Sequence, residues 1–500
     1  MENKLKQLKE ILAECVDLMY AGALLEWDQQ CYMPTGGSEA RSYQMATLKR
    51  LAHQRLTSSE TGQLLEDLKP YAEQLDPDSD DACLLKVAQR RYDKNVKVPS
   101  ELVMEFARAA GASHVVWTKA KAENKFSDFQ PHLEKIIALR RQYADCFAPY
   151  THVYDPLLDD FEAGLKTADV RAIFADLRAQ QVSLLQEIAA RPQVDASFLF
   201  LNFDEQKQWD FGVEAITKIG YNWECGRQDK AVHPFTSNFS SSDVRITTRL
   251  TPDYLGTALF GTLHECGHAL YELGVNPAYD RSLLGGGASL AIHESQSRLW
   301  ENLVGRSFPF WQYFYPRLQE YFPAQFSNVS LETFYKGINQ VSPSLIRVEA
   351  DEATYNLHIM LRLELEIALM EGSLEVKDLP EAWNARMKDY LGVAPSTDSE
   401  GVLQDIHWSN GYIGYFSTYA LGNLISAQLW ERIQTDIPDL ADQIRRGEFA
   451  PLLGWLREKI HHHGSKYEPQ DLVQQVTGSK INAAPYMRYL RAKYSEIYGL

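Results

Sequence analysis

Cysteine is scarce in this sequence, and long apolar runs are missing from it. The six cysteines, at positions 15, 31, 83, 146, 225 and 266, show no paired C-x-x-C spacing, so no disulfide framework is expected. No run of about 18 apolar residues is available to form a transmembrane helix. The first ten residues lack the apolar core of a secretory signal, and a cytoplasmic location is therefore expected.

Basic residues are also fewer than acidic residues. The 50 Lys and Arg residues are outnumbered by 67 Asp and Glu residues, which gives a formal net charge of −17 at pH 7. Such acidity argues against nucleic acid or an anionic membrane as the partner. Linkers, internal repeats and low-complexity tracts are absent, and a hydrophobic content of 45% suffices for a large core. We therefore expect residues 1–500 to form one domain.

Most of the sequence shows helical periodicity. Apolar residues recur every three or four positions, with polar faces between them, in residues 2–25, 38–57, 99–123, 128–148, 167–191 and 203–219. Residues 243–250 instead alternate polar and apolar side chains with a period of two, which is typical of a half-buried strand. The expected fold class is mainly α with a small β-sheet.

The pentapeptide His264-Glu265-Cys266-Gly267-His268 carries the clearest chemical signal. A random chain of this composition would contain H-E-x-x-H roughly 0.02 times, so chance is a weak explanation. On a helix, positions i and i+4 share a face, and both imidazoles can bind one tetrahedral Zn²⁺ while Glu265 lies beside a metal-bound water. Cys266 should point away from the ligands into the core. A buried structural histidine pair is the alternative.

The flanking residues predict that this pentapeptide lies well inside a helix from about 252 to 273. Thr251 is suited to the N-cap and Pro252 to the first helical position. Gly274 is suited to the C-cap.

A site with three protein ligands needs one more donor and leaves its fourth position open. After the loop Gly285-Gly286-Gly287, a second helical pattern begins near Ser289, and it places Glu294 where the side chain can project toward the first helix. We take Glu294 as the third ligand. Its neighbour His293 is the competitor, but adjacent helical residues point about 100° apart, so only one of the two should face the metal.

At this point the sequence resembles the thermostable Taq-type metallocarboxypeptidases. The resemblance rests on His264-Glu265-x-x-His268 followed by His293-Glu294-Ser295-Gln296, and it runs in order from about residue 5 to 495. Further similar blocks are Trp27-Asp28-Gln29, Met33-Pro34, His233-Pro234-Phe235, Asp243-x-Arg245-x-Thr247, Ile346-Arg347-x-x-Ala350-Asp351 and Gly401-x-x-Gln404-Asp405-x-His407-Trp408.

The resemblance implies a neurolysin-like helical fold of two lobes with a deep cleft and a small sheet near the active site. Residues 1–150 would then form a helical lid, and residues 151–500 the zinc-binding catalytic portion. It also implies Glu294 rather than His293 as third ligand, a homodimer, and removal of single residues from peptide C-termini.

Catalysis by such a site needs a base and donors for the oxyanion. Glu265 is expected to take a proton from the metal-activated water and to deliver it to the leaving amine. The segment from His407 to Tyr419 holds three tyrosines and two glycines, for which aromatic packing is the alternative explanation. By resemblance to the wider neurolysin-like group, His407 and Tyr419 are the expected oxyanion donors, with Tyr415 in reserve.

Recognition of a free C-terminus asks for a bidentate cation. Arginine has that geometry. An arginine near a helix start is more often solvated or paired with nearby acids, and it is the resemblance of the Ile346-Arg347-x-x-Ala350-Asp351 block that implies Arg347 as the partner of the terminal carboxylate. An extended peptide could also add to the strand at 243–250 beside Arg245, although an ordinary edge strand with a surface Asp-Arg pair is the alternative. Asp351 could orient a zinc-ligand imidazole.

Three functions compete on this evidence. The favoured one is a zinc carboxypeptidase of broad specificity acting on peptides with a free C-terminus. The second is an oligoendopeptidase or dipeptidase that uses the same centre and does not need Arg347. The third is a peptide-binding protein with a non-catalytic metal, which the presence of Glu265 disfavours because a structural zinc needs no base. Co²⁺ or Mn²⁺ could replace zinc in this donor set, and no motif for a serine or cysteine nucleophile is present.

Overall fold

Helices dominate the computed structural model, which describes residues 1–500. The expected fold class, mainly α with a small β-sheet, is confirmed. The chain folds into two compact units, and each unit draws on three separate stretches of sequence. No helix is both long enough and apolar enough to span a bilayer. The expected division into a lid at 1–150 and a catalytic portion at 151–500 stays a prediction.

The first unit comprises residues 1–96, 196–338 and 429–478. It contains the sheet and the helices α1 (Glu2–Cys31), α2 (Ser38–Leu56), α3 (Ser59–Ala72), α4 (Asp80–Lys97), α9 (Glu205–Ile219), α10 (Leu255–Glu272), α11 (Leu290–Arg298), α12 (Phe308–Tyr321), α13 (Pro323–Phe326), α14 (Leu331–Ile338), α18 (Leu440–Arg445), α19 (Ala450–Lys459) and α20 (Pro469–Thr477).

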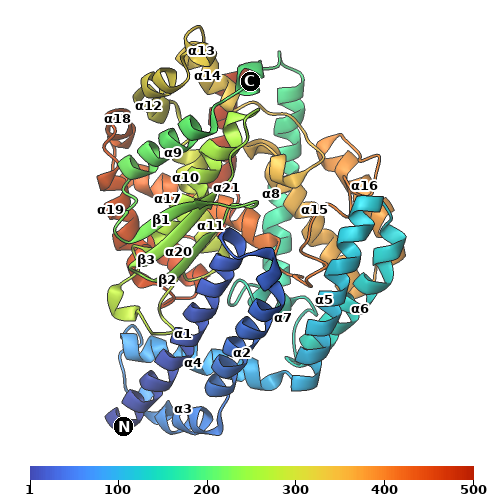
Figure 1. Ribbon diagram of the computed structural model, residues 1–500, viewed down its shortest axis with the longest axis vertical. Coiled ribbons are helices and arrows are strands. Elements are labelled where there is room, and N and C mark those ends of the chain that lie inside the picture. The colour runs from blue at the N-terminus through green and yellow to red at the C-terminus, as the bar shows by residue number, and fades with distance from the viewer. The chain divides into compact units, whose positions relative to one another are not determined.

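The second unit comprises residues 97–195, 339–428 and 479–500. Its helices are α5 (Ser100–Glu123), α6 (Phe126–Asp145), α7 (Asp155–Asp159), α8 (Thr167–Ala189), α15 (Glu352–Glu371), α16 (Leu379–Leu391) and α21 (Ala484–Tyr498), and α17 (Ser417–Asp436) runs across the boundary between the units. Helices α5 and α6 form a long pair that lies side by side (Figure 1).

The sheet of the first unit has three strands: β1 (Gly226–Lys230), β2 (Thr236–Ser240) and β3 (Asp243–Thr248). Strand β3 is central, parallel to β1 and antiparallel to β2. Its apolar positions Val244 and Ile246 are fully buried, as period-two alternation predicts. Helix α10 packs against β2, β3 and α9, and α1 lies beside β2 (Figure 1). The sheet therefore supports the helix that carries the H-E-x-x-H sequence.

The helix boundaries follow local capping chemistry. Asp204 caps α9 by accepting a hydrogen bond from the Lys207 amide, and Gly220 ends that helix in the left-handed region at φ 120°. Ser289 caps α11 by accepting from the Ile292 amide. The six helices expected from periodicity are all present, each with ends within a few residues of the prediction except for the end of α1, which continues to Cys31.

Candidate metal centre

Helix α10 presents the pentapeptide as expected, but its ends differ from the prediction. The helix begins at Leu255 with Tyr254 as a cap residue that makes no side-chain hydrogen bond. The expected N-cap, Thr251, instead bonds to the Tyr254 carbonyl at 2.9 Å and shapes the preceding turn. Gly274 does not supply the C-cap. It is small because a Cβ there would lie 2.5 Å from the Nδ1 atom of the buried His461.

The second variable position of the pentapeptide, Gly267, lets α10 and α11 approach closely. A Cβ at Gly267 would lie 2.6 Å from the Cα of Ser297 and 2.7 Å from the Gln296 carbonyl oxygen. These are backbone atoms of α11 that cannot swing away. The close approach brings the helix that carries Glu294 against the helix that carries both histidines.

The three expected ligands meet at one point. The Nε2 atoms of His264 and His268 each lie 3.7 Å from Oε2 of Glu294, and the donor atoms of the three residues all lie within 4.8 Å of one another. Around a tetrahedral zinc with bonds of about 2.1 Å, neighbouring donors are about 3.4 Å apart. The donor set and its spacing therefore fit a zinc ion held by two imidazoles and one carboxylate oxygen.

Each ligand is held by a further polar partner. Nδ1 of His264 lies 2.8 Å from Oε2 of Glu301, and Nδ1 of His268 lies 2.8 Å from Nδ1 of His293. Arg298 donates from Nε to Oε1 of Glu294 at 2.7 Å and from Nη1 to Oε2 of Glu301 at 3.0 Å. Such partners fix ring orientation and ligand geometry at metal sites.

The surroundings shift the pKa values of the two histidines in opposite directions. Burial lowers the pKa of His264, but the charges of Glu294 and Glu301 outweigh it and the pKa is raised. Burial and the nearby His264 and His293 hold the pKa of His268 well below its usual range, which keeps it in the neutral form that ligates metals. The pKa of Glu301 is lowered to about 2, because Arg298 and His264 outweigh its burial. Glu301 is therefore an ionised acceptor.

Glu265 is buried and orientated by the sheet. Glu265 is 6% exposed, and its Oε2 accepts a hydrogen bond of 2.7 Å from the Thr236 hydroxyl at the start of β2. Burial raises the pKa of Glu265, whereas His264 and the Thr236 hydroxyl lower it, and the net shift is upward. A carboxylate with a raised pKa is a better proton acceptor near neutrality.

Arg245 and the strand at 243–250 differ from the expectation in one respect. Strand β3 is hydrogen-bonded on both sides, so the prediction that a peptide adds to it is wrong, as is the alternative of an edge strand. Arg245 binds both carboxylate oxygens of Asp243 at 2.8 Å and stacks over Trp27, 4.4 Å from the ring centroid. Its donor fork is thus occupied, and its role toward substrate stays a prediction.

Arg347 lies in a buried charge cluster of the second unit. It donates from Nε and Nη2 to Oδ1 of Asp405 at 3.0 and 2.9 Å, and from Nη1 to the Tyr355 hydroxyl at 3.1 Å. Arg362, fully buried, donates to the other oxygen of Asp405. Burial raises the pKa of Asp405, but the two guanidinium groups outweigh it and hold the pKa well below its usual range. Two cations thus share one anion, which leaves one unbalanced positive charge among these three groups.

The other expected residues of this unit gather beside Arg347. The His407 ring lies 5.2 Å from the Tyr415 ring and 6.3 Å from the Tyr419 ring, and the Arg347 guanidinium lies 5.2 Å from the Tyr419 ring centroid. The Tyr419 hydroxyl donates to the Tyr415 hydroxyl at 3.4 Å. Burial lowers the pKa of His407 to about 4 and holds that of Tyr419 well above 10. Both groups are therefore neutral hydrogen-bond donors at neutral pH.

Asp351 does not orient a metal-ligand imidazole. It caps α15 by accepting from the amides of Ala353 and Thr354 at 2.9 and 3.0 Å, and its other oxygen accepts from the Ser342 amide. Three residues that contact the expected ligands or the expected base were not found from the sequence: Thr236, Arg298 and Glu301. Glu272, which contacts His293, was not found either. The spacing of Glu294, Arg298 and Glu301 at i, i+4 and i+7, across α11 and the π-helical segment Leu299–Val304 that continues it, was the available signal for Arg298 and Glu301.

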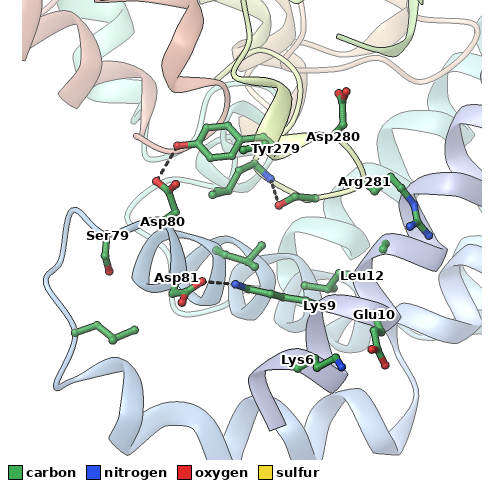
Figure 2. Close-up of a pocket in the computed structure, with 16 residues that line it drawn as sticks. Lys6, Lys9, Glu10, Leu12, Ser79, Asp80, Asp81, Tyr279, Asp280 and Arg281 are labelled. Carbon is green, nitrogen blue, oxygen red and sulfur yellow. Dashed lines mark hydrogen bonds and ion pairs between the residues drawn. The ribbon is translucent and has the colours of Figure 1, made fainter. Parts of the chain in front are cut away.

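A pocket elsewhere in the first unit contributes none of these groups. It has a volume of about 690 Å³ and is lined by α1, the start of α4 and residues 278–284 (Figure 2). Its charges are largely paired, Lys9 with Asp81 at 2.5 Å and Arg281 with Asp17 at 2.7 Å. The expected metal ligands and the expected base thus lie outside this pocket.

Known proteins resemble this chain over nearly its whole length. The profile of the family described as Carboxypeptidase Taq (M32) metallopeptidase matches residues 7–494. Thermostable carboxypeptidase 1 of Thermus thermophilus is 42% identical over 508 residues, which cover 100% of this chain and 99% of that protein. Carboxypeptidase 1 of Bacillus subtilis is 38% identical, with 99% of each covered. The crystal structure of the M32 carboxypeptidase from Deinococcus radiodurans R1 matches with a TM-score of 0.96 at 40% identity, covering 100% of both chains.

Proposed function

Because this chain belongs to the carboxypeptidase Taq (M32) metallopeptidase family, we propose that it is a zinc carboxypeptidase that removes single residues from peptide C-termini with broad specificity. The observation that carries the proposal is the convergence of His264, His268 and Glu294, with each Nε2 atom 3.7 Å from one carboxylate oxygen. This donor set leaves the fourth tetrahedral position for water or substrate, as hydrolytic zinc sites require.

The three ligands would hold the metal by Nε2, Nε2 and Oε2. Zinc, when bound, supplies a Lewis acid that polarises a carbonyl and acidifies water. Co²⁺ or Mn²⁺ can be accepted by the same donors, because two imidazoles and a carboxylate discriminate these metals poorly. The second oxygen of Glu294 is occupied by Arg298, which favours binding through one oxygen alone.

Glu265 is the proposed general base. Its carboxylate takes the proton of the attacking water and later gives it to the leaving nitrogen. The Thr236 hydroxyl, donating to Oε2, limits rotation of the carboxylate and supports its ionised form. A structural metal site would need neither the buried carboxylate nor its donor.

Arg347 is the proposed receptor for the terminal carboxylate of the peptide. Its support is the unbalanced positive charge of the Arg347, Arg362 and Asp405 group, since an anionic ligand would neutralise a charge that is costly when buried. His407 and Tyr419 are the proposed oxyanion donors, with Tyr415 as the partner of the Tyr419 hydroxyl. Both proposed donors are neutral at neutral pH and so carry a proton, and the Tyr419 hydroxyl would exchange its long bond to Tyr415 for one to the oxyanion.

One pair of substrates separates the carboxypeptidase from the oligoendopeptidase or dipeptidase alternative. A peptide with a free C-terminus should be shortened by single residues, whereas the same peptide with an amidated C-terminus should be cleaved far more slowly. Equal rates on both peptides would overturn the exopeptidase assignment. The Arg347→Lys variant keeps the charge and loses the fork, so it should raise KM for the free acid and leave cleavage of the amide unchanged.

A Glu265→Gln variant tests the hydrolytic mechanism itself. The amide keeps the size of the side chain and cannot accept the proton of water, so turnover should be lost while zinc content stays at the wild-type level. Undiminished turnover would refute the proposed base, and a lost metal would show that Glu265 has a structural part. A homodimer is also proposed, and sedimentation of the full chain would test it.

A further inference from the structure

A chain of three side chains leads away from the proposed ligand His268. Its Nδ1 atom lies 2.8 Å from Nδ1 of His293, and Nε2 of His293 lies 2.5 Å from Oε1 of Glu272. Glu272 is the last residue of α10, and His293 belongs to α11. The outer partner of this ligand is therefore a second histidine, in contrast to His264, whose Nδ1 atom meets the carboxylate of Glu301 directly.

The hydrogen bonds around Glu272 fix where the protons of this chain lie. The backbone N–H of Gly287 donates to Oε1 at 3.2 Å, and the Asn238 amide donates to Oε2 at 2.7 Å. A carboxylate with these donors acts as an acceptor, so Nε2 of His293 carries the proton that it receives. A singly protonated His293 ring has only a lone pair on Nδ1, so this atom accepts. With that partner, His268 carries its proton on Nδ1 and keeps the lone pair of Nε2 for a metal.

The glycine-rich loop that precedes α11 is shaped around this chain. A Cβ at Gly287 would lie 2.6 Å from Cδ2 of His293 and 2.8 Å from Cε1 of Tyr271, so a side chain there would displace the imidazole. The Tyr271 ring packs on His293 with centroids 4.9 Å apart, and its hydroxyl accepts a hydrogen bond from the Ala288 amide. The loop backbone thus both encloses the ring of His293 and donates to Glu272.

We propose that His293 is a positioning residue: anchored by Glu272, it holds His268 in the Nδ1-protonated tautomer that binds the metal. The inference rests on the proposed function, because it concerns how one ligand of that metal is prepared. It assigns His293 to the ligand's outer partner and not to the metal, since Oε2 of Glu294 is the atom that faces both Nε2 atoms. His268 donates a hydrogen bond to a histidine, whereas His264 donates one to the carboxylate of Glu301. His268 should therefore be the weaker electron donor to the metal.

A matched pair of variants tests this proposal in the full chain. His293→Asn places an oxygen near the former Nδ1 position and can still accept from His268, whereas His293→Leu has a similar size and no acceptor. The zinc dissociation constant, measured by chelator competition, should rise about 10- to 100-fold in the Leu variant and stay near wild type in the Asn variant. In ¹⁵N-histidine spectra of the metal-free protein, only the Leu variant should shift His268 toward the Nε2-protonated tautomer.

The possible outcomes distinguish this inference from the proposed function. Wild-type zinc affinity and an unchanged His268 tautomer in His293→Leu would overturn the inference, as would equal losses in the Leu and Asn variants. If the wild-type chain itself binds no zinc through His264, His268 and Glu294, the proposed function fails first. Should His293→Leu not fold, Glu272→Met gives the same test, because it leaves Nε2 of His293 without its acceptor and should again free the tautomer of His268.

Discussion

Arg298 holds one oxygen of Glu294 and leaves the other to the histidines. The bond from Nε to Oε1 measures 2.7 Å, while Oε2 lies 3.7 Å from each ligand nitrogen. Both residues are on α11, four positions apart, and Arg298 continues to Glu301 one turn further on. The Arg298 guanidinium thus orients the proposed metal ligand Glu294, and it also orients Glu301, the acid that contacts the proposed ligand His264.

Replacing Arg298 by Met should lower kcat/KM about 10- to 100-fold, the usual effect of losing an outer partner at a metal site. The freed Glu294 could turn both oxygens to the metal and crowd its open position. Arg298→Gln, which keeps a donor within reach of Oε1, should recover much of the loss. Steady-state kinetics with metal analysis of each variant would check this, and full activity in the Met variant would contradict it.

Removing the Thr236 hydroxyl should move the acid limb of the pH profile to higher pH. Burial raises the pKa of Glu265 and the Thr236 hydroxyl opposes that shift, so Thr236→Val raises the pKa further. Only the ionised form accepts a proton, and activity falls as pH falls through this pKa. The measurement is kcat/KM against pH, with Thr236→Ser as the variant that keeps the donor. An acid limb that does not move in Thr236→Val would show that Glu265 is not the titrating base.

The Gly267→Ala variant should be destabilised by about 1–3 kcal/mol, because its Cβ would press on the backbone of α11. Separation of the two helices would also weaken zinc binding. Gly261, on the same helix, is the matched control. A Cβ there meets nothing nearer than Cγ of Pro234 at 3.9 Å, so Gly261→Ala should stabilise by about 0.5–1 kcal/mol. Denaturant midpoints of both variants decide the matter, and equal midpoints would contradict the close approach of α10 and α11.

Asp405→Asn should cost about 3–5 kcal/mol of stability, since it leaves the buried guanidinium groups of Arg347 and Arg362 without their counter-charge. The exposed pair of Asp442 and Arg445 gives the comparison, and Asp442→Asn should cost less than about 1 kcal/mol. Urea unfolding would measure both. A similar small loss in the two variants would mean that Asp405 does not balance the buried cations.

Much of the proposed metal centre could be predicted from the sequence because its parts follow helical geometry. The i, i+4 spacing put His264 and His268 on one face, and the 100° step between neighbours meant that only one of His293 and Glu294 should face the metal. The family resemblance then implied Glu294. The alternation of polar and apolar residues located β3, because side chains of a strand point to opposite faces of the sheet in turn. Family resemblance, rather than spacing, brought Arg347, His407 and Tyr419 into the proposal.

What the sequence could not give depends on contacts between distant segments. The partner of the Glu265 carboxylate is Thr236 on another element, and nothing in its neighbourhood distinguishes it from other threonines. The sheet order made β3 central, which no local alternation can reveal. Gly274 looked like a helix cap, yet its size is set by His461, 187 positions along the chain. Such roles depend on tertiary packing, which local patterns do not encode.

The proposed ligands and the acid behind His264 lie on α10, on α11 and in the π-helical segment Leu299–Val304 directly after α11, all close in sequence. His264 and Glu301 are 37 positions apart, whereas the bond between Tyr32 and Asp229 in the same unit joins residues 197 positions apart. Loop-closure entropy grows with the logarithm of length, so closing the shorter loop costs about 1.5 kcal/mol less. Bringing the residues of the metal centre together therefore costs little chain entropy. A bound ion would act as a cross-link that closes one short loop.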